Sequence, residues 1–171
     1  MKAIGFTHSL GIDETQSLFE FDVPDPVANG RDLLVDVKAV SVNPADAKRR
    51  IRTAVDTPHE APLVLGYDAV GVVAAVGSDV TNFAVGDEVW YAGDPTRSGS
   101  NAQRQLVDER VVGRKPKNLS WAEAAAMPLT GLTSFEMLFD RFCITEGSGK
   151  GKSLLVIGGA GGGGSLTIQR A

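Results

Sequence analysis

A cluster of glycines near the end of the sequence constrains the fold more than any other feature. Nine of the 20 glycines lie between Gly147 and Gly164, and only seven residues follow them in the 171-residue sequence. Residues 159–164 read Gly-Ala-Gly-Gly-Gly-Gly and fit the pattern G-x-G-x-x-G. They follow the apolar run 153–157, which is typical of a fully buried parallel strand, and they precede a sequence from Ser165 that favours a helix.

This order of strand, turn and helix is the context in which such glycines bind a dinucleotide. The first glycine permits a tight turn, the second lets the backbone approach a pyrophosphate, and the third allows close packing of helix on strand. The N–H groups at the start of the helix would face the phosphates. A flexible linker is the alternative, because Gly-Gly-Gly-Ser at 162–165 has a linker's composition. The candidate phosphate-binding residues are Gly159, Ala160, Gly161, Gly162, Gly163 and Gly164.

A complete dinucleotide site needs more chain than this. About 20 residues past the glycines, a second strand ends in an acid that binds the ribose hydroxyls or in basic groups that accept a 2′-phosphate. Only seven residues remain after Gly164. We therefore expect the adenosine half of the site to lie outside this chain, and these residues do not distinguish NAD from NADP.

Residues 1 to about 115 are rich in valine and are punctuated by Gly, Pro, Asn and Asp. Short strands joined by turns have this pattern, so the sequence predicts an all-β body. Strands are predicted near residues 1–6, 33–41, 69–76, 85–91 and 105–112.

Beyond this body the pattern changes to helices. Ser120 and Glu123 have the spacing of a capping box, and the alanines at 124–126 favour a helix. Pro128 ends this helix, and a second one starts around 130–133. The second helix has apolar residues at spacings of three and four, which predict a face buried as plain core. These residues are Leu132, Phe135, Leu138, Phe139 and Phe142.

Charge and hydropathy narrow the class of partner. The 21 acids and 17 bases give a net charge of −4, which provides no general attraction to nucleic acid or to anionic membranes. No apolar run approaches the roughly 20 residues of a membrane-spanning helix, and residues 1–6 resemble a strand more than a signal peptide. We expect a cytoplasmic protein that binds neither nucleic acid nor membrane.

Metal ligands are too few and too scattered for a zinc site. A catalytic zinc usually has three protein ligands and a structural zinc has four, whereas this chain offers only Cys143, His8 and His59 among cysteine and histidine. The sequence therefore predicts that the chain binds no zinc and that both histidines are solvated.

Four segments carry a resemblance to a known family. They are Ser-Val-Asn-Pro-Ala-Asp-Ala-Lys at 41–48, Leu-Gly-Tyr-Asp-Ala-Val-Gly-Val-Val at 65–73, Val-Gly-Asp-Glu-Val at 85–89 and Pro-Leu-Thr-Gly-Leu-Thr-Ser at 128–134. In this order they resemble the medium-chain dehydrogenase/reductase superfamily, and within it the quinone oxidoreductase branch and its zinc-type alcohol dehydrogenase-like relatives. The resemblance implies a mainly β fold, a GroES-like barrel over 1–125. Over 126–171 it implies a connecting helix followed by the first strand and glycine turn of an α/β Rossmann domain that binds NAD(P).

The chain departs from the zinc-using members of that superfamily. Where those enzymes carry a ligand cysteine and a Gly-His-Glu segment, this chain has Ser-Val-Asn-Pro at 41–44 and Gly-Tyr-Asp at 66–68, and it lacks the four-cysteine lobe. A reductase without zinc must polarise its carbonyl substrate through hydrogen bonds instead of a Lewis acid. The resemblance makes the Asn43 amide and the Tyr67 hydroxyl the candidates for that role.

Each candidate residue also has a structural interpretation. Asn43 would contact cofactor or substrate, or it only starts a turn before Pro44. Tyr67 could equally be a half-buried strand residue. Asp46 either lines the site or, as we favour, caps a short helix over 45–50. Thr130 resembles the family threonine that approaches the nicotinamide, or it is a simple N-cap.

The resemblance implies an NADPH-dependent oxidoreductase that transfers hydride to a quinone or an α,β-unsaturated carbonyl. NADPH is preferred to NAD only because the resembled branch prefers it, and Gly163 departs from the valine that the family usually has there. We expect this chain to be the N-terminal half of the enzyme and inactive alone, and the full-length protein could form a homodimer. The alternatives are a zinc-type alcohol dehydrogenase-like reductase of aldehydes or ketones, and a non-catalytic GroES-like interaction module.

Overall fold

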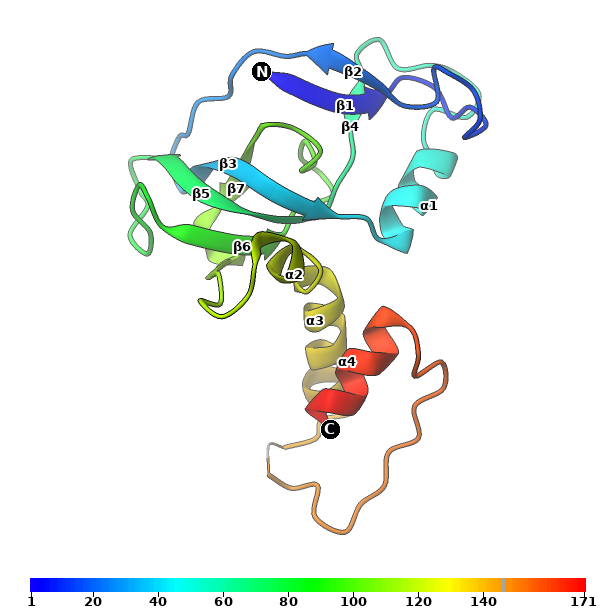
Figure 1. Cartoon of the computed structure of the whole chain (residues 1–171), viewed down its shortest axis with the longest axis vertical. Coiled ribbons are helices and arrows are strands. Elements are labelled where there is room, and N and C mark those ends of the chain that lie inside the picture. Colours follow the sequence, from blue (N-terminus) through cyan, green and yellow to red (C-terminus); the bar gives the residue numbers. More distant parts are fainter. Residues whose placement is uncertain (146) are drawn as a thin grey trace. The chain divides into compact units, whose positions relative to one another are not determined.

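The computed structural model describes residues 1–145 and 147–171. These residues form two compact units, Met1–Ala126 and Met127–Ala171, which we describe separately (Figure 1).

The first unit, Met1–Ala126, is built from two antiparallel sheets. One sheet has the strand order β2-β1-β4, with β1 at Lys2–Phe6, β2 at Phe19–Asp22 and β4 at Leu63–Val64. The other has the order β7-β3-β5-β6-β8, with β3 at Asp32–Ser41, β5 at Asp68–Val76, β6 at Glu88–Ala92, β7 at Arg104–Asp108 and β8 at Val112–Arg114. The unit is therefore mainly β, as its valine-rich strands predict.

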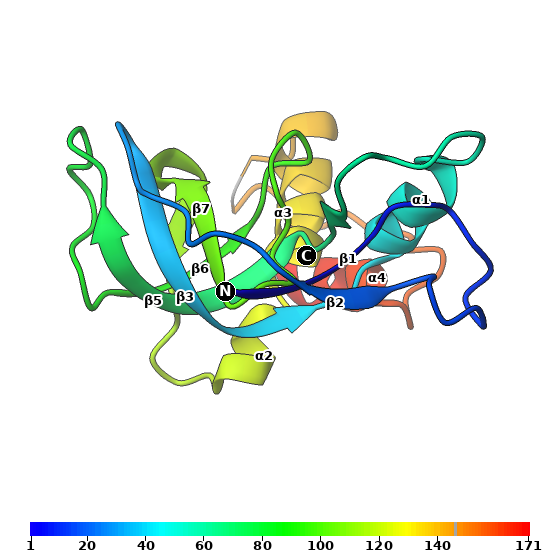
Figure 2. The same cartoon turned by 90° about the horizontal axis from the view of Figure 1, so that it is seen from above.

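The pair β3 and β5 organises this unit. The two strands run antiparallel side by side, from Leu33 opposite Val76 to Ser41 opposite Asp68 (Figure 2). Alternate residues of these strands face the core, where Leu33 and Val73 are buried. The register places the polar end of β3 directly opposite the polar start of β5.

The first strand is tied to a distant part of the chain. The N–H of Ile4 donates to the carbonyl of Asn101 at 2.8 Å, and the N–H of Gln103 donates to the carbonyl of Lys2 at 3.0 Å. An isolated bridge between Ala3 and Ala102 lies between these two bonds. These contacts join β1 to the segment just before β7.

The predicted strand near 105–112 is interrupted. β7 ends at Asp108, a turn of 3₁₀ helix occupies Glu109–Val111, and β8 begins at Val112. The Glu109 side chain is buried, and its Oε2 accepts from the N–H groups of Thr81 and Asn82 at 3.0 and 2.9 Å. This carboxylate thus binds a loop from another part of the unit, and the turn itself is capped by Asp108, whose Oδ1 accepts from the N–H of Arg110 at 2.9 Å.

Two helices complete the first unit. Helix α1, at Pro44–Arg52, begins with proline at its first position and carries arginines in its last turn, where they complement the helix dipole. Helix α2, at Trp121–Ala125, starts at the predicted capping box: the N–H of Ser120 donates to Glu123 Oε2 at 2.9 Å, and the N–H of Glu123 donates to Ser120 Oγ at 3.3 Å. The capping-box prediction is confirmed.

The second unit, Met127–Ala171, contains two packed helices. Helix α3, at Pro128–Phe135, continues into a π-helical turn at Glu136–Arg141, and helix α4 spans Gly162–Arg170. Helices α3 and α4 contact each other, and Thr167 Oγ1 lies 3.2 Å from Ser134 Oγ in this contact.

The apolar face predicted on the second helix is only partly buried. Leu138 is buried, but Leu132, Phe135 and Phe142 are exposed. The prediction of a plain core is wrong for these three residues, because α4 covers one side of α3 within this unit and leaves the other side open.

Residues 153–157 form no strand in the structure. Leu155 and Ile157 are 85% and 91% exposed, whereas a parallel strand was expected here with both faces covered. A strand needs neighbouring strands for its N–H and C=O groups, and the described residues of this unit provide none. Among the described residues, no helix is long and apolar enough to cross a membrane.

Candidate functional site

The turn between β3 and α1 holds two of the predicted site residues in contact. The backbone N–H of Asn43 donates to Asp46 Oδ2 at 2.8 Å, and Asp46 Oδ1 accepts from the N–H of Gly66 at 3.1 Å. Asn43 and Asp46 are both buried. The Asp46 carboxylate therefore joins the start of α1 to the turn before β5, in addition to the local role expected of a cap.

Asp68, the first residue of β5, lies beside them and is fully buried. Its Oδ2 accepts from Ser41 Oγ and from Asn43 Nδ2, each at 2.7 Å, and its backbone carbonyl accepts from Ser100 Oγ at 3.0 Å. We call Ser41, Asn43 and Asp68 the Asp68 cluster. Neither Ser41 nor Asp68 was among the predicted site residues.

A signal for Asp68 was present in the sequence. An aspartate stands at the start of the otherwise apolar run at 68–76, and carboxylates are almost never fully buried unless they have partners. Those partners are 25 and 27 residues away in the chain, so only the register of β3 on β5 reveals them.

Gly66 and Tyr67 form the turn that leads into Asp68. Gly66 has φ of +109°, a Cβ at this position would overlap Ser100 Oγ, and only glycine fits both conditions. Tyr67 is half-buried and lies in the turn before β5, not in a strand. Its backbone carbonyl accepts from the N–H of Gly93 at 2.7 Å, which connects the turn to the end of β6.

The glycine-rich segment of the second unit forms an ordered turn that leads into α4. Gly158 has φ of +73°, and its carbonyl accepts from the N–H of Gly161 at 3.1 Å. A Cβ on Gly164 would lie 2.7 Å from Gly159 Cα and would overlap the Gly158 carbonyl. The close approach expected of the third glycine is therefore present, and the segment is a turn and helix start instead of a flexible linker.

Thr130 lies beside this turn within the second unit. Its Oγ1 donates to the Met127 carbonyl at 3.3 Å, and its Cγ2 is 3.5 Å from where a Cβ on Gly162 would stand. The residue at the N-cap of α3 is Met127, so Thr130 is the third residue of the helix and not its cap.

The predicted residues thus form two groups. Asn43, Asp46 and Tyr67 belong to the first unit, and Thr130 and the glycines at 159–164 belong to the second. The glycine turn fits a dinucleotide phosphate, because it presents a helix start without side chains.

Within residues 1–145 and 147–171, no three His, Cys, Asp or Glu side chains are grouped so as to hold a metal ion.

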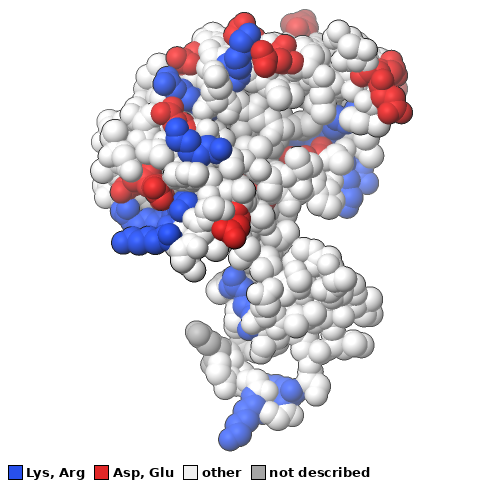
Figure 3. Space-filling view, in the orientation of Figure 1, with Lys and Arg blue, Asp and Glu red and all other residues white. Residues whose placement is uncertain are grey.

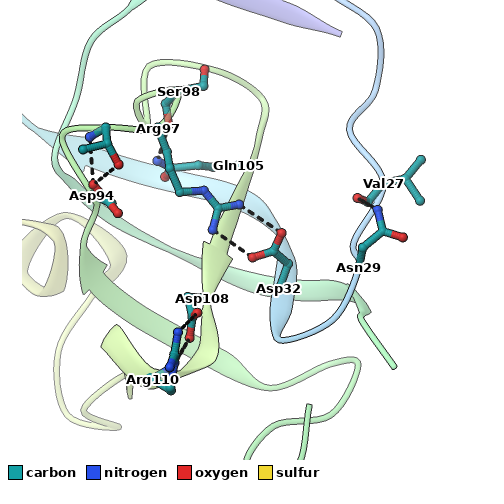
Figure 4. Close-up of polar contacts among 10 residues, drawn as sticks. Val27, Asn29, Asp32, Asp94, Arg97, Ser98, Gln105, Asp108 and Arg110 are labelled. Atoms are coloured by element: carbon teal, nitrogen blue, oxygen red, sulfur yellow. Dashed lines mark hydrogen bonds and ion pairs between the residues drawn. The ribbon is translucent and has the colours of Figure 1, made fainter. Parts of the chain in front are cut away.

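A second polar region, which the sequence did not indicate, lies beside β7 (Figure 4). Arg97 pairs with Asp32 through two bonds of 2.8 and 3.0 Å, and Gln105 Nε2 donates to the Ser98 carbonyl at 3.0 Å. Arg97 and Gln105 line a cavity of about 480 Å³. Bonds from Arg110 hold the pKa of Asp108 at its edge well below the usual range.

Charges of both signs are interspersed over the first unit on the face drawn in Figure 3. The first unit also contains ion pairs, among them Lys2 with Asp22 at 3.0 Å and Arg104 with Asp36 at 2.8 Å. This face therefore has no broad region of a single charge.

Comparison with known proteins identifies relatives over the whole chain. Residues 29–136 match the family model described as "Alcohol dehydrogenase GroES-like domain". A "Zinc-type alcohol dehydrogenase-like protein" of Staphylococcus epidermidis is 49% identical over 100% of this chain and 50% of its own length. An "NADPH-dependent alkenal/one oxidoreductase, chloroplastic" of Arabidopsis thaliana is 40% identical over 100% of this chain and 44% of its own length.

Solved structures agree with these relatives. The quinone oxidoreductase from Coxiella burnetii superposes with a TM-score of 0.81 at 30% identity, over 99% of this chain and 52% of its own. The chain thus spans about half the length of the relatives that it matches.

Proposed function

The chain belongs to the alcohol dehydrogenase GroES-like domain family of the medium-chain dehydrogenase/reductase superfamily, and from this membership we propose that it is the N-terminal half of an NADPH-dependent oxidoreductase. The proposed substrate is a quinone or an α,β-unsaturated carbonyl compound. The half is proposed to be inactive alone.

The glycine turn at 158–164 is the observation that carries this proposal. A side chain at Gly164 would collide with the turn, and the first residues of α4 are themselves glycines. The start of a helix offers N–H groups without intrahelical partners and the positive end of the helix dipole, both of which favour a phosphate. The residues at 159–164 would hold the pyrophosphate of a dinucleotide.

The class of substrate is supported by the names of the relatives. One of them is named as NADPH-dependent and as acting on alkenals and alkenones, and a structural neighbour is named a quinone oxidoreductase. The first name gives an alkenal or alkenone as the substrate, and the second gives a quinone. A zinc-type reductase of aldehydes or ketones remains the second candidate, because the Staphylococcus relative carries the zinc-type name.

In the proposed reaction, bound NADPH supplies the hydride and the protein supplies orientation and electrostatics. The β-carbon of an unsaturated carbonyl would receive that hydride, and the α-carbon would receive a proton from water. The Tyr67 hydroxyl is proposed to donate to the carbonyl oxygen, where negative charge develops. Thr130, beside the glycine turn, is proposed to contact the nicotinamide end of the cofactor.

Other properties remain predictions. We propose a cytoplasmic location, no nucleic-acid or membrane partner, and no bound zinc. A homodimer is proposed for the full-length protein only.

The test compares two polypeptides. One is the 171-residue chain, and the other extends through the coding sequence beyond Ala171. NADPH is titrated into each while the fluorescence of Trp90 and Trp121 is followed, and NADPH oxidation is then assayed with a simple quinone, an alkenone and an aldehyde.

We expect the longer polypeptide to oxidise NADPH with the quinone or the alkenone, and the 171-residue chain to show no turnover. Submicromolar NADPH binding with turnover by the short chain would overturn the half-enzyme proposal. No oxidation by the longer polypeptide would overturn the oxidoreductase, and turnover of the aldehyde alone would favour the second candidate. Gly164→Val in the longer polypeptide should weaken NADPH binding, with Gly131→Ala as the matched glycine control because its Cβ meets open space.

A further inference from the structure

Strand β7 has a free edge, because β3 is its only partner among the described strands. At one end of this pair the N–H of Val37 donates to the carbonyl of Gln103 at 3.0 Å. At the other end the N–H of Glu109 donates to the carbonyl of Arg31 at 2.9 Å. Such bonds fall on every second residue of an antiparallel strand, and here these are the odd-numbered ones. The backbone N–H and C=O of Leu106 are therefore turned away from β3.

The cavity of about 480 Å³ lies along this free edge. Four consecutive residues of β7, at 105–108, line it. Successive side chains of a strand point to opposite faces, so a cavity that touches all four residues runs along an edge of the strand. The other edge is occupied by β3. Residues 92–94, at the end of β6, also line the cavity, and Gly93 among them has no side chain to fill it.

One acceptor in the cavity lining is buried without a partner. Gln105 is 4% exposed, and its Nε2 donates to the Ser98 carbonyl at 3.0 Å (Figure 4). Its Oε1 is buried and has no hydrogen-bond partner among the described residues. A buried polar atom that stays unpaired costs free energy, and such atoms are rare in folded proteins. An N–H group of a ligand would supply the missing donor.

The charges of the cavity lining balance one another. Arg97 is bonded to Asp32 at 2.8 and 3.0 Å, and Arg110 is bonded to Asp108 at 2.9 and 2.7 Å (Figure 4). Asp94 is exposed and adds a second carboxylate to the lining, so that two arginines and two aspartates border the cavity. Because both guanidinium groups are already paired, a neutral polar ligand fits this lining better than a free anion.

We propose that this cavity binds a short, extended, neutral peptide that adds to the free edge of β7. In an antiparallel pair, one residue exchanges two hydrogen bonds with the residue opposite, and Leu106 presents both the donor and the acceptor for this exchange. A further peptide N–H would pair with Gln105 Oε1. A simple ion or an apolar compound lacks these groups, and the cavity has the size of a small-ligand site.

The first experiment compares two blocked peptides that differ by one N–H. One is acetyl-trialanine methylamide, and in the other the central alanine is N-methylated. Each is titrated into the ¹⁵N-labelled 171-residue chain. We expect the unmethylated peptide to shift the backbone signals of residues 92–94 and 105–108 and to slow solvent exchange of the Leu106 N–H. It should bind about fivefold more tightly than the methylated peptide, the ratio that one ordinary hydrogen bond provides.

Two variants of Leu106 separate its backbone from its side chain. Leu106→Pro removes the outward N–H and leaves the bonds to β3 in place, because proline is tolerated on the free side of an edge strand. Leu106→Ala keeps the N–H and shortens the side chain. We expect Leu106→Pro to lose the fivefold preference and Leu106→Ala to retain it. If Leu106→Pro fails to fold, the comparison of the two peptides on the wild-type chain still decides.

Equal binding of the two peptides, no binding at millimolar concentration, or shifts confined to β8 or to residues 153–157 would overturn the proposal. The titration is repeated with the polypeptide that extends beyond Ala171. Loss of peptide binding there, with the Leu106 N–H already protected from exchange, would also overturn it, because the rest of the polypeptide would then cover the edge. The cavity includes no residue of the glycine turn, so failure of NADPH binding counts against the proposed function alone.

Discussion

The two units of the chain differ in how far their apolar residues are buried. In Met1–Ala126 the inward residues of β3, β5 and β6 cover one another, so that Leu33, Val35 and Val89 are wholly inaccessible to solvent. In Met127–Ala171, Leu155 and Ile157 are almost fully exposed. The strands of the first unit pair with one another, whereas the described residues of the second unit form no strand.

Buried polar groups show the same contrast. In the first unit Asp46, Asp68 and Glu109 each bind groups from distant parts of the chain. In the second unit the buried side chains of Ser134 and Thr167 join two helices through neutral hydroxyls. The first unit therefore contains buried carboxyl groups with distant hydrogen-bond partners as well as an apolar core.

The largest difference between the units is expected when a buried leucine of the first unit and an exposed leucine of the second are each replaced by alanine. Leu33→Ala opens a cavity in the core of the first unit and should lower the free energy of unfolding by about 3 kcal/mol. Leu155→Ala should change it by less than about 0.5 kcal/mol. Urea unfolding followed by circular dichroism measures both, and Leu138→Ala is the buried control for the second unit. A large loss for Leu155→Ala would show that this residue is buried in solution.

The next largest difference is expected when a glycine in each unit is replaced by alanine. Gly66→Ala forces a side chain into a left-handed backbone at φ of +109° and against Ser100, so we expect a loss of about 2 kcal/mol. Gly131→Ala, in α3 with open space around it, should instead gain up to about 1 kcal/mol. Thermal unfolding of the two variants beside the wild type is the measurement. Equal tolerance at both positions would contradict the described turn at Gly66.

Acid should weaken the first unit through Glu109. Backbone N–H groups of Asn82 and Thr81, and the Arg31 guanidinium, hold the pKa of this carboxyl below its usual value of 4.5. A lowered pKa in the folded state contributes stability above pH 4.5 that is lost as the pH falls towards the folded pKa. Urea midpoints of the wild type should therefore fall with pH in this range, and those of Glu109→Gln should fall less steeply. The exposed control Glu60→Gln should follow the wild type.

The smallest effect is expected inside the glycine turn. Gly163→Ala meets no atom within 4 Å and should stabilise α4 by about 1 kcal/mol, because alanine is the better helix former. Gly164→Ala should destabilise the turn, since its Cβ collides with Gly158. The helical signal of the two variants is compared at increasing temperature. The same sign for both would count against the close approach at Gly164.

Local sequence signals predicted the local structure well. The alternation of Val35 and Val37 with polar neighbours predicted β3, and the capping box at Ser120 predicted the start of α2, because both patterns act between residues near in sequence. The wrong predictions concern structure that depends on residues distant in the sequence or outside the described chain. The buried Glu109 carboxylate has its partner in a loop 27 residues earlier, and a strand at 153–157 would need neighbouring strands that the described residues of this unit do not provide.

The candidate site likewise has one part that adjacent residues predict and another part that depends on distant partners. The close backbone approach at Gly164 was predicted from its spacing alone, since the turn and the helix start are contiguous in the sequence. The Asp68 cluster was found only in part: Asn43 came from the resemblance, but Asp68 became visible through the register of β3 on β5. A residue whose hydrogen-bond partners lie on another strand cannot be recognised from the residues next to it in the sequence.

The bond from Ile4 to Asn101 sets an order for folding during synthesis. Strand β1 leaves the ribosome almost 100 residues before the segment to which it bonds. At about 5–20 residues per second, the edge of β1 that receives this segment waits roughly 5–20 s for its partner. The hairpin-like pair of β1 and β2 can form early, but the first unit closes only after residues 101–103 have emerged. Until then this unpaired edge of β1 is open to pairing with a strand of another chain.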